Sequence, residues 1–119
     1  TYFFDTYAAF ALVEGKSSYA RYTEYPIAFT IFNLVELYFL ILRDFGEKKA
    51  NQIYHQFKEC VIEITDEVIA EAMAFRLANK RKSLSYADCI GYFCAKKNTL
   101  KFLTGDEAFQ HLDNVEFVH

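Results

Sequence analysis

Residues 85 to 109, SYADCIGYFCAKKNTLKFLTGDEAF, decide the fold class of this chain. A helix-forming segment from Ser85 to Lys97 leads into a short apolar strand from Leu100 to Leu103, and a polar turn from Thr104 to Asp106 follows. A helix that feeds directly into a buried strand is typical of the crossover unit of a parallel sheet. The stretch therefore predicts an α/β fold.

The rest of the chain repeats this alternation of short strands and helices. Strands are predicted at residues 2–4, 27–31, 61–64 and 115–118, helices at 6–14, 18–24, 33–45, 47–58 and 66–80, and a short turn at 106–112. This order predicts a parallel sheet covered on both faces, with right-handed crossovers. Helix 33–45 is apolar on nearly every face, which predicts either core or a dimer interface, with core expected for most of its residues.

Length and composition bound the class of protein. A chain of 119 residues can bury one hydrophobic core, so we expect a single domain over residues 1–119. Aromatic residues make up 18% of it and it has one Pro, which argues against a disordered chain. The net charge of -3 argues against a protein that coats nucleic acid by bulk charge, although a local basic patch remains open.

Cysteine usage and hydropathy indicate where the protein works. Three Cys residues without a CxxC pair predict neither a disulfide framework nor a zinc knuckle, so a reducing cytoplasm is the expected compartment. We expect no targeting segment at the start of the chain. The longest apolar run, 27–42, is too short to span a membrane and contains Asn33 and Glu36, so no membrane association is expected.

Four carboxylates stand out by their position at junctions between predicted strands and helices. They are Asp5, Glu36, Asp88 and Asp106. In a parallel sheet, functional sites gather beyond the carboxyl ends of the strands, so these acids are expected to converge. Oxygen ligands without Cys or His are the preference of a hard cation such as Mg²⁺ or Mn²⁺, which can activate water and stabilise a phosphate under attack.

A purely structural role is the alternative for each acid taken alone. Ser85 to Asp88 and Thr104 to Glu107 fit the capping-box pattern, Asn33 to Glu36 is a near variant, and Asp5 is placed to cap the first helix. Glu36 favours the functional interpretation, because its neighbours are apolar and an unpaired carboxylate stripped of water is costly. None of the three His residues has metal-ligand spacing, and the Cys residues are expected in the core.

The order of these motifs resembles the PIN domain family. The segments concerned are Phe-Phe-Asp5-Thr6, Asn-Leu-Val-Glu36, Leu-Ser-Tyr-Ala-Asp88, and Leu-Thr104-Gly-Asp106-Glu-Ala-Phe. They span nearly the whole chain, and within the family they are most similar to the VapC-type toxins of prokaryotic toxin-antitoxin pairs. The resemblance implies a three-layer α/β/α sandwich with a mainly parallel central sheet.

The resemblance also implies an activity, a site and partners. The activity would be that of an endoribonuclease dependent on Mg²⁺ or Mn²⁺, with Asp5, Glu36, Asp88 and Asp106 as metal-binding and catalytic acids. Thr104 would be a supporting catalytic hydroxyl and Thr6 an assisting one. The expected partners are an RNA substrate, a small antitoxin protein that covers the active-site groove, and a second copy of the chain in a homodimer.

A group of bases is the candidate RNA-binding feature. Between residues 76 and 101 the chain carries Arg76, Lys80, Arg81, Lys82, Lys96, Lys97 and Lys101 against the single acid Asp88. Such residues can bind phosphates without reading the base sequence, although an ordinary solvated helix face remains the alternative.

Two rival functions stay open from the sequence. A receiver-like signalling domain would also place acids at strand ends, but it needs paired acids after the first strand and a Lys after the last, and neither is present here. A PIN-like domain that has lost catalysis and serves as an interaction module is the other rival.

Overall fold

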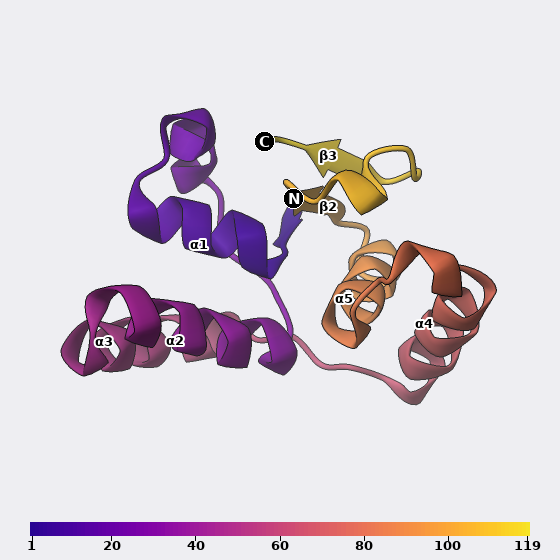
Figure 1. Ribbon diagram of the computed structural model, residues 1–119, viewed down its shortest axis with the longest axis horizontal. Helices are drawn as coiled ribbons and strands as arrows, with labels where there is room; N and C mark the ends of the chain where they lie inside the picture. Colours follow the sequence, from indigo (N-terminus) through magenta and orange to yellow (C-terminus); the bar gives the residue numbers. More distant parts are fainter.

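The computed structural model describes residues 1–119 and centres on a three-stranded parallel sheet (Figure 1). Its strands are β1 (Tyr2–Phe4), β2 (Lys101–Thr104) and β3 (Val115–Phe117), in the order β1-β2-β3. In the register of the first pair, Phe4 lies opposite Leu103. The predicted α/β class with a parallel central sheet is therefore confirmed.

Helices cover both faces of this sheet. The α-helices are α1 (Thr6–Glu14), α2 (Ile31–Phe45), α3 (Glu47–Phe57), α4 (Asp66–Ala78) and α5 (Tyr86–Lys97), and 3₁₀ helices span Ser17–Glu24, Lys58–Cys60, Lys80–Lys82 and Glu107–Phe109. Helix α5 packs on one face with α4 outside it, and α1 packs on the other. Figure 1 shows the α2–α3 hairpin beside α1, at the opposite end of the long axis from α4. No helix is long and apolar enough to cross a lipid bilayer.

Aromatic side chains from alternate strand positions build the core on each face. Phe3 stacks on Phe102 with their ring centroids 5.7 Å apart, and both rings face α5. Gly91 of α5 permits this close approach, because a Cβ at that position would lie 2.9 Å from the Phe3 ring. On the other face Tyr2 packs edge-on against Tyr22 of the first 3₁₀ helix. The strand alternation thus fixes which face each helix covers.

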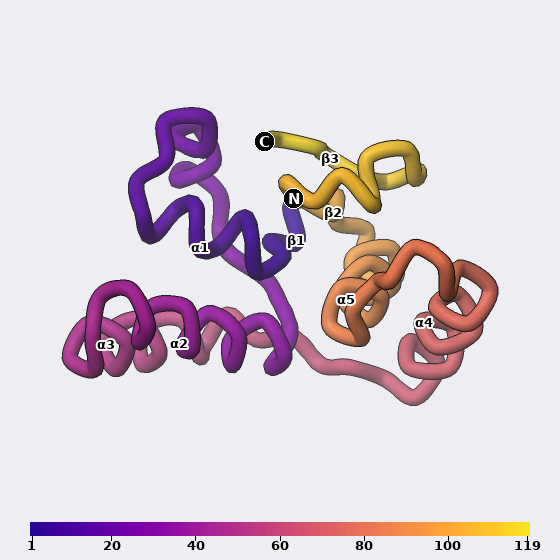
Figure 2. The backbone as a smooth tube through the Cα atoms, in the orientation of Figure 1, coloured from indigo at the N-terminus to yellow at the C-terminus, as the bar shows by residue number.

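The strands predicted at 27–31 and 61–64 are wrong. These segments are extended but pair only at one parallel bridge between Phe29 and Val61. Figure 2 shows segment 27–31 leading from the first 3₁₀ helix to the start of α2, and segment 61–64 leading from the α2–α3 hairpin towards α4. Pro26 has no N–H to donate, and Thr30 already caps α2, which begins at Ile31. Too few residues are left between these two limits for a strand.

The prediction that most of helix 33–45 lies in the core is also wrong. Only Asn33, Leu34, Leu37 and Ile41 of α2 are buried. Its other face exposes large apolar side chains, namely Ile31, Phe32, Val35, Phe39, Leu42 and Phe45. Helix α2 packs against α1 and α3 and more lightly against α5, and these contacts leave the other apolar residues exposed.

Candidate active site

Asp5 and Thr104 lie side by side where β1 and β2 end. Both are buried, with Asp5 only 2% exposed. The in-register pairing of the two strands places them next to each other, and the Thr104 hydroxyl donates a hydrogen bond to Oδ2 of Asp5. The other carboxylate oxygen, Oδ1, accepts the backbone N–H of Ala8 at 2.8 Å and so caps α1. Asp5 is therefore both a helix cap and the innermost acid.

Glu36 reaches the same place from the second turn of α2. The Thr6 hydroxyl donates to its Oε1, and the Asn33 amide donates to the Thr6 oxygen at 3.1 Å. Asn33 in turn accepts from the backbone N–H of Thr30 at 3.0 Å. The sequence predicts the N-cap of this helix at Asn33, which is three residues too late. Thr30 is the N-cap of α2, and Asn33 is the second residue of its capping box. Glu36 is half-buried and hydrogen-bonded, so it is less desolvated than its apolar neighbours in the sequence suggest.

Asp88 from the first turn of α5 and Asp106 from the turn after β2 complete the group. Ser85 caps α5 as predicted, its Oγ accepting the backbone N–H of Asp88 at 3.0 Å. The predicted cap at Thr104 is wrong, because Asp106 itself caps the 3₁₀ helix that follows and accepts from Ala108 at 3.0 Å. Thr104 instead accepts the backbone N–H of Asp106 at 3.0 Å. One hydroxyl therefore joins Asp5 to the Asp106 turn.

The environment makes two of these acids hard to ionise. Burial raises the pKa of Asp5 to about 8, against the hydrogen bonds from Thr104 and Ala8, with smaller upward effects from the charges of Asp88 and Asp106. Burial likewise raises the pKa of Asp88 to about 6, with Asp106 and Glu36 adding to the increase. Each carboxylate thus lies within electrostatic range of others in the group, which is typical of functional sites.

All four acids open onto one cleft of about 980 Å³. Its lining residues are Asp5, Thr6, Tyr7, Val35, Glu36, Phe39, Leu40, Ser85, Asp88, Gly105, Asp106 and Glu107. The structure thus brings together all four acids predicted from the sequence, with Thr6 at the wall and Thr104 directly behind Asp5. Helix α2 contributes the apolar side chains Val35, Phe39 and Leu40 together with Glu36, and the other acids come from the strand ends and α5.

The donor set fits a hard divalent cation in its chemistry. It consists of carboxylate and hydroxyl oxygens, with no Cys or His in the cleft. No three His, Cys, Asp or Glu side chains approach closely enough to enclose a metal ion together. A protein-bound Mg²⁺ ion usually keeps several waters and takes one or two carboxylates directly. Asp5 is buried and held by two donors, whereas Glu36, Asp88 and Asp106 are only partly buried.

The basic residues of segment 76–101 do not form one group. Lys96 pairs with Asp113 at 3.3 Å and Lys97 lies 3.8 Å from Glu67, at the far end of α5 from Asp88. Arg76, by contrast, packs 4.1 Å above the Tyr86 ring near the start of α5. Arg76 thus lies at the start of α5, which is the end that carries Asp88.

Three further residues shape the site, and none of them is assigned a role in it from the sequence. Asn33 is a buried polar residue that positions Thr6, although its spacing of three from both Thr30 and Glu36 is a weak signal. Tyr7 covers Gly105 so closely that a Cβ there would lie 2.2 Å from its ring. Gly105 is therefore required for the cleft to keep its shape.

Comparisons with known proteins place this geometry in context. A family model described as PIN domain matches residues 2–115. The fold is similar to that of VapC20 from Mycobacterium tuberculosis, described as a sarcin-ricin loop cleaving toxin, with a TM-score of 0.79, 17% identity and full coverage of both chains. It is also similar to a chain of a toxin-antitoxin complex from Klebsiella pneumoniae, with a TM-score of 0.76, 18% identity, and coverage of 98% of this chain and 96% of that one. No curated protein sequence matches the chain.

Proposed function

This chain belongs to the PIN domain family, and on that premise we propose that it is a metal-dependent endoribonuclease. The observation that carries the proposal is the convergence of Asp5, Glu36, Asp88 and Asp106 on one cleft. Burial and mutual repulsion oppose the ionisation of Asp5 and Asp88, and a bound cation would relieve both effects. A structural role as caps accounts for the backbone bonds of these acids but not for their shared cleft.

The burial and hydrogen bonds of each side chain indicate its role in the proposed reaction. A divalent cation bound by these acids supplies charge stabilisation for a phosphate and a more acidic water. Asp88 and Asp106, half-buried at the cleft wall, would hold it directly. With a cation bound, Asp5 would ionise and add negative charge at the floor of the cleft, and Thr104 positions Asp5 relative to Asp106. Glu36, oriented by Thr6, is placed to orient water on the α2 side.

We further infer that the protein is the toxin of a toxin-antitoxin pair, acting on RNA in the cytoplasm as a single domain. The names of the two structural neighbours support this role, since one is described as a sarcin-ricin loop cleaving toxin and the other comes from a toxin-antitoxin complex. Three free Cys residues, two of them buried, suit a reducing compartment. The antitoxin would cover the acidic cleft.

The outer apolar face of α2, from Ile31 to Phe45, supports protein partners as well. Side chains such as Phe39, which is 60% exposed, would be shielded in a homodimer or beneath an antitoxin. Phe39 and Val35 also line the acidic cleft. A partner bound to this face would therefore reach the edge of the active site.

The direct test is RNA cleavage by the purified protein and by Asp88→Asn. With Mg²⁺ or Mn²⁺ the unmodified protein should cut a structured RNA, and a chelator should stop the reaction. Asp88→Asn keeps the side-chain shape and the Ser85 cap while removing one charge from the cleft, so we expect a loss of at least about 100-fold. Equal cleavage by the variant would assign the activity to another site or to a contaminant. No cleavage by either protein would favour a non-catalytic interaction module.

A further inference from the structure

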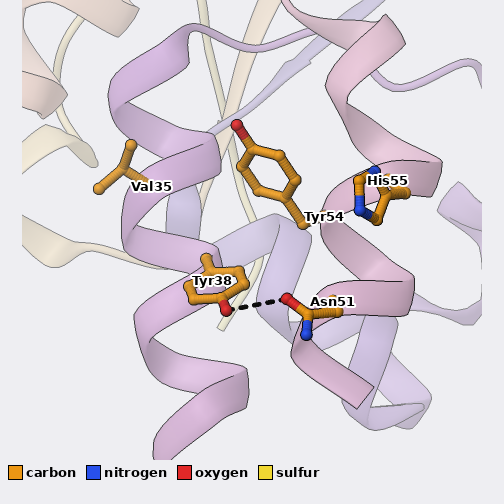
Figure 3. A pocket seen from close by; sticks show the side chains of 5 residues that line it. All are labelled: Val35, Tyr38, Asn51, Tyr54 and His55. Carbon is orange, nitrogen blue, oxygen red and sulfur yellow. Dashed lines mark hydrogen bonds between the residues drawn. The ribbon is translucent and has the colours of Figure 1, made fainter. Parts of the chain in front are cut away.

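A second pocket, of about 340 Å³, lies between α2 and α3 (Figure 3). Val35, Tyr38, Asn51, Tyr54 and His55 line it. Val35 also lines the acidic cleft, so the two cavities meet across a single residue of α2. The pocket therefore adjoins the acidic cleft.

The pocket combines aromatic rings with one oriented amide. The Tyr54 ring meets those of Tyr38 and His55 edge-on, with centroid distances of 5.6 and 5.7 Å. The Tyr38 hydroxyl donates to Oδ1 of Asn51 at 2.9 Å (Figure 3), which leaves the Asn51 NH₂ group without a protein acceptor. Half-exposed Tyr54 thus offers a ring for stacking, and Asn51 offers donors to a carbonyl or ring nitrogen.

Positive charge extends along the same face of α3. Lys48, Asn51, His55 and Lys58 recur at intervals of three or four residues, which places them on one side of the helix. Lys48 and Lys58 are exposed and make no salt bridge. Cationic side chains on both sides of an aromatic pocket match a phosphate backbone with one base turned inward. The apolar face of α2 lacks this pattern and suits protein contact better.

We propose that the Tyr38–Tyr54 pocket is a subsite for an unpaired nucleobase of the RNA whose scissile phosphate lies in the acidic cleft. The proposal rests on the proposed ribonuclease function and adds a reason for preferring single-stranded or looped RNA. In it, Tyr54 stacks on the base, Asn51 donates a hydrogen bond to its edge, and Lys48 and Lys58 contact the flanking phosphates. These are positioning roles and not catalytic ones.

A tryptophan reporter tests base stacking without any cleavage. The chain has no Trp, so Tyr54→Trp introduces a single fluorophore into the pocket. In the Asp88→Asn background, a 15-nucleotide single-stranded RNA of mixed sequence should quench this fluorescence, and the same RNA in a duplex should quench it far less. Leu77→Trp is the matched control, because Leu77 is 72% exposed on α4 and should not respond. Equal responses at positions 54 and 77 would overturn the subsite.

Affinity measurements with further variants separate this proposal from the proposed function. Tyr54→Leu should weaken binding of the single-stranded RNA about 5- to 100-fold, while Tyr54→Phe should bind almost as well as the unmodified protein. Asn51→Ala changes an exposed side chain, so it keeps the test valid if Tyr54→Leu does not fold. It should weaken binding of the single-stranded RNA about 3- to 10-fold.

Each contrary result has its own meaning. Unchanged binding by both variants, with cleavage intact, would overturn the subsite and leave the ribonuclease standing. Absence of RNA binding and cleavage in the unmodified protein would overturn both. A fluorescence signal of the Tyr54→Trp variant that changes with protein concentration and not with RNA would overturn the subsite in favour of contact with a second copy of the chain.

Discussion

Asp5 shows how one residue can serve stability and function together. Its Oδ1 caps α1 while its Oδ2 accepts from Thr104, so the sequence alternatives of cap and site residue do not exclude each other. The acid is buried, and burial raises its pKa to about 8. An acid with a raised pKa in the folded state makes folding less favourable as pH rises, because the folded protein binds the proton more tightly than the unfolded chain.

The Asp5 side chain therefore predicts a pH-dependent stability. Without metal, the penalty is absent below about pH 4 and grows until about pH 8, so the melting temperature should fall over this range. Asp5→Asn keeps the cap and removes the charge, and it should raise the melting temperature at pH 8 by about 5 °C. Thermal melts in EDTA from pH 4 to 8 provide the measurement. Parallel pH profiles for the two proteins would contradict the assignment of the shift to Asp5.

Thr104 is predicted to tune the acid beside it. Thr104→Ala removes the donor that lowers the pKa of Asp5, so the pKa should rise further and the rising limb of the cleavage profile should move to higher pH. It also leaves the N–H of Asp106 without its acceptor, which should destabilise the fold by about 1–3 kcal/mol. Thr104→Ser retains the hydroxyl and should restore the pH profile. If Thr104→Ser behaved like Thr104→Ala, the methyl group and not the hydroxyl would be responsible.

At the scale of elements, the contact between α5 and the sheet holds Asp88 in place. Gly91→Ala improves helix propensity by about 1 kcal/mol, but the new Cβ would lie 2.9 Å from the Phe3 ring and 3.3 Å from Phe102. The overlap should cost more than the propensity returns, for a net loss of about 1–2 kcal/mol in urea unfolding. The double variant Gly91→Ala with Phe3→Leu should recover part of it, and additivity of the two losses would contradict a direct clash.

The elements that the sequence predicts well are those with their own capping and periodicity. The α5–β2 unit is predicted to within one residue at each end, because Ser85 caps the helix and apolar residues fill the strand. The structure of segment 27–31 is predicted wrongly, since β-branched residues fit an extended connection as well as a strand. The hydrogen-bonding role of Asn33 could not be predicted from the sequence either. Its partner Thr6 comes next to it only through the packing of α1 against α2.

At the scale of the whole molecule, the net charge of -3 is distributed unevenly. Five acids line one cleft, the four predicted ones and Glu107, and the 13 bases outnumber the acids that remain elsewhere. The negative balance that argues against a nucleic-acid partner thus comes largely from the site proposed to cut one. The same unevenness applies to hydrophobic residues, because α2 carries a row of large apolar side chains on the outside.

That exposed row predicts self-association through α2. Phe39→Ser should shift the protein towards monomer in sedimentation velocity, and it should change the melting temperature of the monomer by less than about 3 °C because the side chain is 60% exposed. Leu77→Ser on α4, where the side chain is 72% exposed, is the matched control and should leave the assembly unchanged. A monomeric unmodified protein at about 100 μM would assign the α2 face to another partner.

A Mg²⁺ titration of the melting temperature tests most directly that the four acids act as one cation site. At about ten times the dissociation constant, binding to the folded state contributes about 1.4 kcal/mol, or about 5 °C for a chain of this size. Asp88→Asn should lose most of this increase, while Glu71→Gln, which removes an exposed acid from α4, should keep it. An unchanged melting temperature up to about 10 mM Mg²⁺, or an equal rise in all three proteins, would contradict a cation site in the cleft.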